Sequence, residues 1–185
     1  MDLGVISVRY ARALLKSAIA EKQEYELYQS MQSLAESYVN VPELRFTIDN
    51  PMLSKEAKQT VLETACGNNV NQLTKRFIAL VLKEGREKAL QFMAASYITL
   101  YRKHNNITSS RLVTASTVDT ATEQKVIRLV EGNTQGTVEF HAEVDPEIIG
   151  GFILEYDTYR MDASVKSKLR RILTELKKQI KCQIK

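Results

Sequence analysis

The spacing of apolar residues changes near residue 105 of this chain of 185 residues. As far as residue 105, apolar side chains recur every three or four positions, as they do on the buried face of an α-helix. From residue 107 onward an alternation with a period of two enters, which is typical of a strand with one buried face. The sequence therefore predicts a mainly α fold, with a helical bundle over residues 1–105 and a small α+β domain over residues 106–185.

The first half of the chain predicts six short helices with brief connections, which together indicate a compact bundle. Ser54 marks the start of one helix and Gly67 marks its end, and Gly85 marks the end of the helix that follows. The first and fifth helices carry more apolar surface than one core-facing stripe requires. On the first helix this surface spans two sides: Ile6, Tyr10, Ala13 and Ser17, then Ala11, Leu14, Leu15 and Ala18. The surplus either belongs to a central helix of the core or lines a groove for another helix.

The second half predicts alternating strand and helix. Residues 111–117 read as a strand, and residues 137–144 as a strand with one buried face. Between them, Thr120 and Glu123 have the spacing of a capping box, and Gly132 can close the helix that follows.

The stretch "VDPEIIGGFILEYDTYRMDAS", residues 144–164, predicts a hairpin. A two-residue turn at Asp157 and Thr158 sets three cross-strand pairs: Tyr156 with Tyr159, Glu155 with Arg160, and Leu154 with Met161. The predicted inner face consists of Phe152, Leu154, Tyr156, Tyr159 and Met161. Apolar and charged residues both fit this register, which supports it.

Five residues around this hairpin predict its local geometry. Asp145, before a proline, indicates a change from extended chain to turn. Gly150 and Gly151 permit positive φ or a close approach of the backbone, and Asp162 or Ser164 can cap the final helix. The apolar residues of that helix form a single stripe: Val165, Leu169, Ile172, Leu173, Leu176 and Ile180.

The basic charge of the chain is concentrated in the final helix. Residues 160–185 carry nine Lys or Arg against Asp162 and Glu175, so the net charge of +4 leaves the other 159 residues at −3. One interpretation is a helical nucleic-acid-binding protein that uses these basic residues: Lys166, Lys168, Arg170, Arg171, Lys177, Lys178 and Lys181. No aromatic residue is interleaved with them, and the acidic remainder offers no second contact surface, so a solvated face or a face for an acidic partner is favoured.

No pattern in the sequence predicts catalysis, a metal or a cofactor. The pair Gly150-Gly151 precedes a strand and lacks the remaining glycines and the lysine of a phosphate-binding loop. His104 and His141 lie in different halves, and Glu139 and Glu143 share the outer face of a strand with no cleft implied.

The cysteines and the absence of a long apolar run bear on where in the cell the protein is found. Cys66 and Cys182 match no ligand or redox spacing, which predicts free thiols in a reducing cytoplasm. The chain has no run of eighteen apolar residues, and its first residues lack the pattern of an export signal. We therefore expect no direct membrane insertion.

Residues 144–176 resemble the signature of the delta subunit of F-type ATP synthases, whose mitochondrial counterpart is the oligomycin-sensitivity-conferring protein. The resemblance continues in "RYARALLKSA", residues 9–18, and in "FIALVLKEGREKAL", residues 77–90. The chain departs from the family at the hairpin turn, where Asp157-Thr158 replaces a Gly-Asp type of turn and makes a looser turn possible. It also has Arg160 where the family commonly has an apolar residue, opposite Glu155.

The resemblance implies a non-catalytic connector of a proton- or sodium-translocating ATP synthase, at the cytoplasmic face of the bacterial inner membrane. Such a connector joins the catalytic head to the peripheral stalk, so that the head does not turn with the rotor. The bundle would receive the N-terminal helix of an alpha subunit between its first and fifth helices, on Tyr10, Ala13, Leu14, Ser17, Phe77, Ile78 and Val81. The second domain would engage the b subunits of the stalk, with Lys166, Arg170, Arg171 and Lys177 as the candidate residues. Neither a nucleic acid nor a cofactor is implied.

Overall fold

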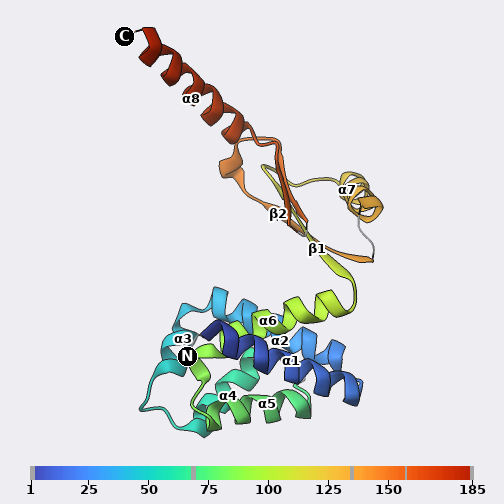
Figure 1. The fold of residues 1–185 in the computed structure, drawn as a ribbon, viewed down its shortest axis with the longest axis vertical. Coiled ribbons are helices and arrows are strands. Elements are labelled where there is room, and N and C mark those ends of the chain that lie inside the picture. Colours follow the sequence, from blue (N-terminus) through green and yellow to red (C-terminus); the bar gives the residue numbers. More distant parts are fainter. Residues whose placement is uncertain (1–2, 68–69, 134–135, 157, 184–185) are drawn as a thin grey trace. The chain divides into compact units, whose positions relative to one another are not determined.

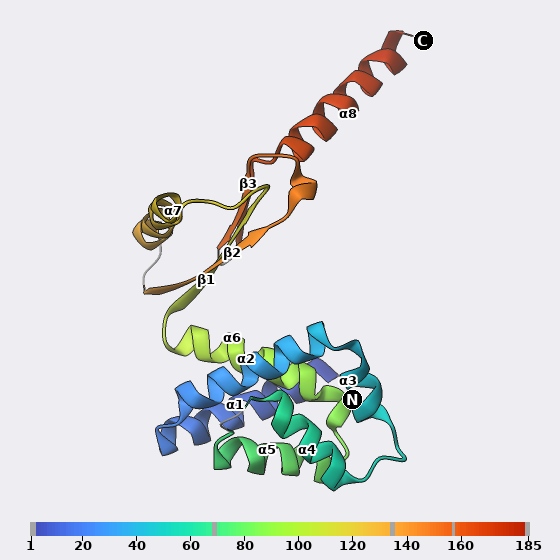
Figure 2. The same cartoon turned by 180° about the vertical axis from the view of Figure 1, so that it is seen from behind.

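The computed structural model describes residues 3–67, 70–133, 136–156 and 158–183, with backbone alone at 133 and 178–183. The chain divides into two compact units, Met1–His104 and Asn105–Lys185. The first unit is helical, and the second combines a sheet with helices, so the predicted fold class is confirmed (Figures 1 and 2).

The first unit contains the six predicted α-helices. They are α1 (Leu3–Glu21), α2 (Glu24–Asn40), α3 (Pro42–Asp49), α4 (Lys55–Ala65), α5 (Gln72–Lys83) and α6 (Leu90–His104), with a short 3₁₀ helix η1 (Glu87–Ala89) before α6. Ser54 caps α4 as predicted, because its Oγ accepts a hydrogen bond from the Ala57 amide at 3.2 Å. Asn71 caps α5 in the same way, with Oδ1 accepting from the Thr74 amide at 2.8 Å.

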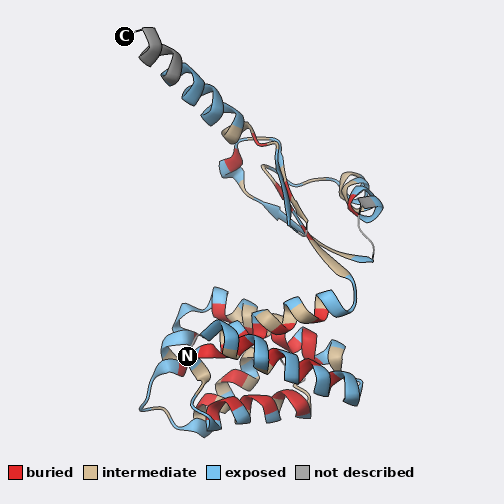
Figure 3. Cartoon of the chain, in the orientation of Figure 1, coloured by how far each residue is buried: buried red, intermediate tan, exposed pale blue. Residues whose placement is uncertain are grey.

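The core of the first unit lies where α1, α2 and α6 pack together, and Figure 3 shows the buried residues on their inward sides. Tyr28 and Tyr101 stack there with ring centroids 4.3 Å apart, and Tyr97 packs beside Tyr101. The Tyr97 hydroxyl donates a hydrogen bond to the Glu24 carbonyl at 3.1 Å. Burying these rings removes a large apolar area from water while the Tyr97 hydroxyl keeps a hydrogen bond, so the aromatic cluster holds α2 against α6.

The second unit is built on a four-stranded sheet. Its elements are β1 (Ile107–Thr114), α7 (Thr120–Asn133), β2 (Thr137–Val144), the 3₁₀ helix η2 (Pro146–Ile148), β3 (Phe152–Tyr156), β4 (Tyr159–Asp162) and α8 (Val165–Gln183). The strand order is β2-β1-β3-β4. Strands β1 and β2 are parallel and joined through α7, whereas β3 is antiparallel to both β1 and β4.

Three local predictions in the second unit were wrong. The first strand covers 107–114 and not 111–117, because its ladder with β2 begins at Ile107 and ends at Thr114. Helix α7 begins at Thr120 itself, and Asp119 stands before it, accepting the Thr122 hydroxyl on Oδ1 and the Thr122 amide on its carbonyl. The capping box was therefore placed one residue too late. The helix also runs through Gly132 to its last residue, 133.

The predicted hairpin register is confirmed, since all three cross-strand pairs occur between β3 and β4. Thr158 lies in the turn, and Asp157 lies outside the described residues.

The predicted inner face of the hairpin is only partly buried. Leu154 is buried and Tyr156 packs against it, but Phe152, Tyr159 and Met161 are exposed by 36%, 64% and 47%. Helix α7 contributes Val126 and Val130 to a core with β1, β2 and β3, and β4 is the edge strand beyond it. Alternation marked the correct face but could not show how far the covering helix extends.

Candidate partner-binding sites

The first unit carries an apolar groove between α1 and α5, with a volume of about 390 Å³. Its lining consists of Arg9, Tyr10, Ala13, Leu14, Ser17, Leu73, Arg76, Phe77 and Leu80. Of these side chains, Leu14, Leu73 and Phe77 are buried and form the floor. The lining is apolar except for two arginines and the hydroxyls of a tyrosine and a serine, which makes the groove a surface for an apolar partner and not a polar reaction site.

Helix periodicity explains how the two walls are built. On α1, Arg9, Ala13 and Ser17 follow one another at four-residue spacing and are all exposed. On α5, Arg76 and Leu80 have the same spacing and exposure. Residues four apart lie one above the other on a helix, so each wall has an exposed outer row above the buried floor. The α1 row contains small residues, which allow a partner's backbone to approach closely.

The sequence-predicted groove residues divide into two groups. Tyr10, Ala13, Leu14, Ser17 and Phe77 line the groove. Ile78 and Val81 have no exposed surface and lie in the core of the bundle, outside the lining. Phe77, Ile78 and Val81 all belong to the apolar surface of α5, and the apolar pattern of one helix does not show which of its residues a neighbouring helix covers.

Four further lining residues were absent from the predicted set: Arg9, Leu73, Arg76 and Leu80. The leucines belong to the apolar stripe of α5 and could have been included on that signal. The arginines carry no apolar signal in the sequence, although the aliphatic stem of an arginine can line an apolar surface.

Tyr10 is held at the wall of the groove by Arg86, whose guanidinium carbon lies 5.5 Å from the centre of the Tyr10 ring. Arg86 follows α5, and its amide donates to the Val81 carbonyl at 3.0 Å. This cation–π contact links the turn after α5 to α1 and orients the ring beside the groove.

Helix α8 presents a second exposed surface. Four of its apolar residues are about half exposed, namely Leu169 (51%), Ile172 (52%), Leu173 (53%) and Leu176 (52%). Among the predicted stalk-facing residues, Arg170, Arg171 and Lys177 are exposed, and Lys166 forms an ion pair with Glu147 at 3.2 Å. Ile180 belongs to the predicted stripe, but its side chain is outside the described part of the helix.

The glycine pair fits closely against the start of α8. Gly151 has φ of +75°, and a Cβ atom there would lie 2.4 Å from the Ala163 carbonyl oxygen. A Cβ on Gly150 would lie 3.2 Å from a methyl carbon of Val165. Two backbone hydrogen bonds of 2.9 Å close the contact, from the Ala163 amide to the Phe152 carbonyl and from the Val165 amide to the Gly150 carbonyl. The role of the glycines is therefore architectural: they let β3 and the beginning of α8 meet backbone to backbone.

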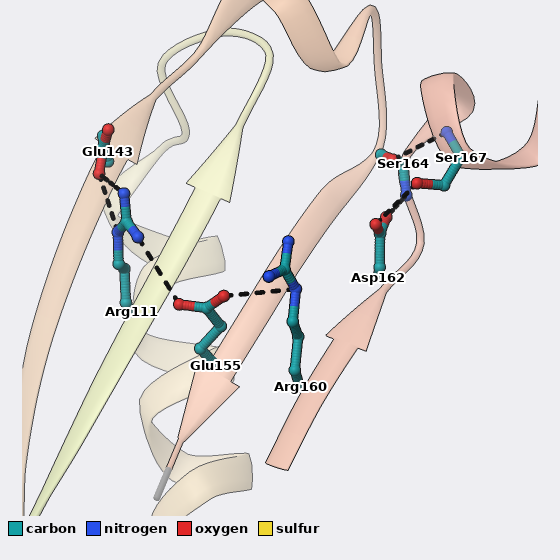
Figure 4. A network of polar contacts seen from close by, with 7 residues as sticks. All are labelled: Arg111, Glu143, Glu155, Arg160, Asp162, Ser164 and Ser167. Carbon is teal, nitrogen blue, oxygen red and sulfur yellow. Dashed lines mark hydrogen bonds and ion pairs between the residues drawn. The ribbon is translucent and has the colours of Figure 1, made fainter. Parts of the chain in front are cut away.

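Asp162 and Ser164 both act at the start of α8 (Figure 4). Ser164 Oγ accepts the Ser167 amide at 3.2 Å. Asp162 accepts the Ser164 amide at 3.0 Å and the Ser167 hydroxyl at 2.7 Å. These hydrogen bonds from Ser164 and Ser167 lower the pKa of the Asp162 carboxyl to about 2. Asp145 acts similarly at the start of η2, where its Oδ1 accepts the Glu147 amide at 2.9 Å.

The outer face of the sheet carries a row of alternating charges across its four strands (Figure 4). Arg111 Nε donates to Glu143 at 2.9 Å, and its Nη1 lies 3.6 Å from a Glu155 oxygen. Arg160 Nε lies 3.4 Å from the other Glu155 oxygen. The hydrogen bond to Glu143 raises the pKa of Arg111. These side chains are substantially exposed, so their ion pairs add little to the free energy of unfolding. Their main effect is to favour this order of neighbouring strands.

Neither metal binding nor membrane crossing finds support in the described residues. Within them, no group of three or more His, Cys, Asp or Glu side chains is arranged to hold a metal ion. No helix in the described ranges combines the length and the apolar character needed to span a bilayer.

A helical unit with an open apolar groove, followed by a small α+β unit with an exposed amphipathic helix, defines a protein that binds other chains. The comparisons with known proteins agree. The family described as "ATP synthase delta (OSCP) subunit" matches residues 6–176. The chain belongs to this family.

Curated relatives and a solved structure support the assignment. The chain is 46% identical over 173 residues to "ATP synthase subunit delta" of Phocaeicola vulgatus, covering 93% of this chain and 94% of the relative. It is 44% identical over 176 residues to the protein of the same description in Parabacteroides distasonis, covering 95% and 98%. A chain of the Toxoplasma gondii mitochondrial ATP synthase hexamer shares the fold, with a TM-score of 0.69 at 23% identity over 92% of this chain and 96% of that one.

The predicted role of a peripheral-stalk subunit of an ATP synthase is confirmed by this membership. None of these comparisons favours the alternative of a nucleic-acid-binding protein.

Proposed function

We propose that the chain is a non-catalytic connector that binds the catalytic head of a bacterial ATP synthase through its first unit and the peripheral stalk through its second. The observation that carries this proposal is the apolar groove between α1 and α5. The connector sits at the cytoplasmic face of the membrane, because the head and the stalk that it joins lie there. Its work is mechanical: it keeps the head from turning with the rotor and performs no chemistry.

The first unit receives the N-terminal helix of an alpha subunit in this groove. The floor of Leu14, Leu73 and Phe77 accepts the apolar stripe of an incoming amphipathic helix. Each leucine-sized side chain buried there contributes about 1.5–3 kcal/mol. The side chains of Ala13 and Ser17 on the α1 wall are small, so the backbone of the incoming helix can approach α1 closely. Ile78 and Val81 support the floor from the core and make no contact with the partner.

The second unit docks the b subunits of the stalk on α8. Four half-exposed apolar residues along this helix supply the contact area: Leu169, Ile172, Leu173 and Leu176. Arg170, Arg171 and Lys177 are exposed on the same helix, and their charge favours an acidic partner. Lys166 is engaged with Glu147 within the unit and contributes less.

The groove is tested by calorimetric titration of the purified chain with a peptide of about 20 residues from the N-terminus of the alpha subunit of the same organism. We expect saturable one-to-one binding. Ala13→Asp places a charge on the α1 wall and should abolish it. Ala95→Asp is the matched control, because Ala95 is exposed on α6 and does not line the groove. Absence of binding to the folded wild-type chain, or equal binding to both variants, would remove the groove from the proposal.

The stalk contact is tested with a C-terminal fragment of the b subunit of the same organism. Leu173→Asp should abolish binding, because it puts a charge into the apolar stripe. Thr174→Asp, one position along and outside that stripe, should leave binding intact. Binding that survives Leu173→Asp would show that α8 does not dock the stalk through its apolar face.

A further inference from the structure

Two arginines stand on opposite walls of the groove. Arg9 belongs to the exposed outer row of α1, and Arg76 belongs to the exposed outer row of α5. Neither forms an ion pair with any part of the chain that the structure describes. The neighbouring Lys75 differs, since it pairs with Glu63 at 3.7 Å.

No acidic residue balances these charges at the groove. The lining contains two arginines and no Asp or Glu. Helix α1 also carries Arg12 and Lys16, and its first acidic residue is Glu21 at its last position. The apolar floor is thus bordered by positive charge on both sides, within a potential that attracts a negative ligand.

We infer that the groove selects an amphipathic helix with acidic residues on both flanks of its apolar stripe, and that Arg9 and Arg76 determine this specificity. The inference rests on the proposed function, since it describes the chemistry of the helix that the groove receives. When such a helix lies on the floor, its stripe faces Leu14 and Phe77, and its flanking positions come next to the two outer rows. A carboxylate on either flank then meets a guanidinium, and a lysine meets like charge.

Charge also disfavours a second copy of the chain as the partner that binds in the groove. Its exposed amphipathic helix α8 has flanks of Lys and Arg, with Glu175 as the only acidic residue between 165 and 177 in that described helix. Basic flanks would lie against Arg9 and Arg76, so charge opposes this pairing.

The test uses three synthetic helical peptides that share one leucine stripe and differ only in their flanks, which carry Glu, Gln or Lys. Dissociation constants for the full chain are measured by calorimetry at low and high salt. We expect the Glu peptide to bind most tightly and the Lys peptide most weakly, with the difference reduced at high salt. Arg9→Gln and Arg76→Gln should each reduce the preference for Glu over Gln by about two- to fivefold, as for an exposed ion pair.

Arg12→Gln is the matched control, because it removes the same charge from α1 outside the groove lining. It should change the preference by less than about twofold. Equal binding of the three peptides to the folded chain overturns the inference about charge, while the groove is retained as the helix-binding site. A preference for Glu that survives both groove variants, or that Arg12→Gln reduces equally, also overturns it. If the alpha-subunit peptide binds and none of the three does, the inference fails alone; if no peptide binds, the proposed function fails with it.

Discussion

Replacing Gly151 by alanine should destabilise the second unit by about 2–5 kcal/mol. The backbone at φ of +75° costs an L-residue about 1–2 kcal/mol. The new Cβ would lie 2.4 Å from the Ala163 carbonyl oxygen, so β3 and the start of α8 must separate. Separation breaks the hydrogen bonds from the Ala163 amide to Phe152 and from the Val165 amide to Gly150. Each contributes about 0.5–1.5 kcal/mol, which gives the range stated.

Alanine substitutions at two other glycines separate the cost of positive φ at Gly151 from the cost of its close contact with Ala163. Gly132 lies inside α7 with nothing within 4 Å of a new Cβ, so Gly132→Ala should be neutral or stabilise by up to about 1 kcal/mol. Gly85 has φ of +63° and open space around it, so Gly85→Ala should cost the backbone part alone, about 1–2 kcal/mol.

The measurement is urea unfolding followed by circular dichroism and tyrosine fluorescence, since the chain has no tryptophan. Hydrogen exchange locates the change, and we expect the Ala163 and Val165 amides to lose protection in the Gly151 variant. The reasoning is refuted if Gly151→Ala costs no more than Gly85→Ala, or if those two amides stay protected.

Three further outcomes are expected. Lys58 is buried and pairs with the partly buried Glu87 at 3.1 Å. Lys58→Met should destabilise the first unit by about 1–3 kcal/mol in urea unfolding, because the Glu87 carboxylate loses its partner, and an unchanged free energy of unfolding would contradict this. The pKa of Asp162 is lowered to about 2, so its capping contribution is present above the unfolded-state pKa of about 3.9 and is lost as the pH falls toward 2. The Ser164 amide should lose exchange protection over that interval, and Asp162→Asn should remove the dependence. Burial raises the pKa of Cys66 to about 12, so iodoacetamide at pH 8 should label this thiol only after denaturation, as peptide mass spectrometry would show.

Much of the fold could be predicted because its signals are local. The apolar periods of the two halves follow from how a helix and a strand place successive side chains, and neither depends on distant neighbours. The hairpin register could be predicted for the same reason, since a slip by one residue would turn Glu155 and Arg160 toward the covered face. The start of α7 was predicted one residue late, because the side chains of Asp119 and Thr120 are both suited to a cap and only the backbone conformation distinguishes them.

The candidate site was predicted in part. Tyr10, Ala13 and Phe77 could be identified because the apolar surface of their helices exceeds what a core requires, and the family resemblance indicated a groove. Ile78 and Val81 have the same apolar character, yet the structure places them in the core. A helix pattern gives the direction of each side chain around its own axis and no information on which neighbouring helix covers it.

The sequence by itself determined the elements, their order and the hairpin pairing, because each depends on residues close together in the chain. It also indicated special backbone at the pair Gly150-Gly151, and the structure places the positive φ at Gly151. The tertiary structure alone decided that Arg9 and Arg76 line one groove from its two walls, although 67 positions separate them in the chain. It also decided that Met161 stays exposed at the edge of the sheet. Both outcomes depend on which elements come to lie beside one another, and packing between distant segments sets that arrangement.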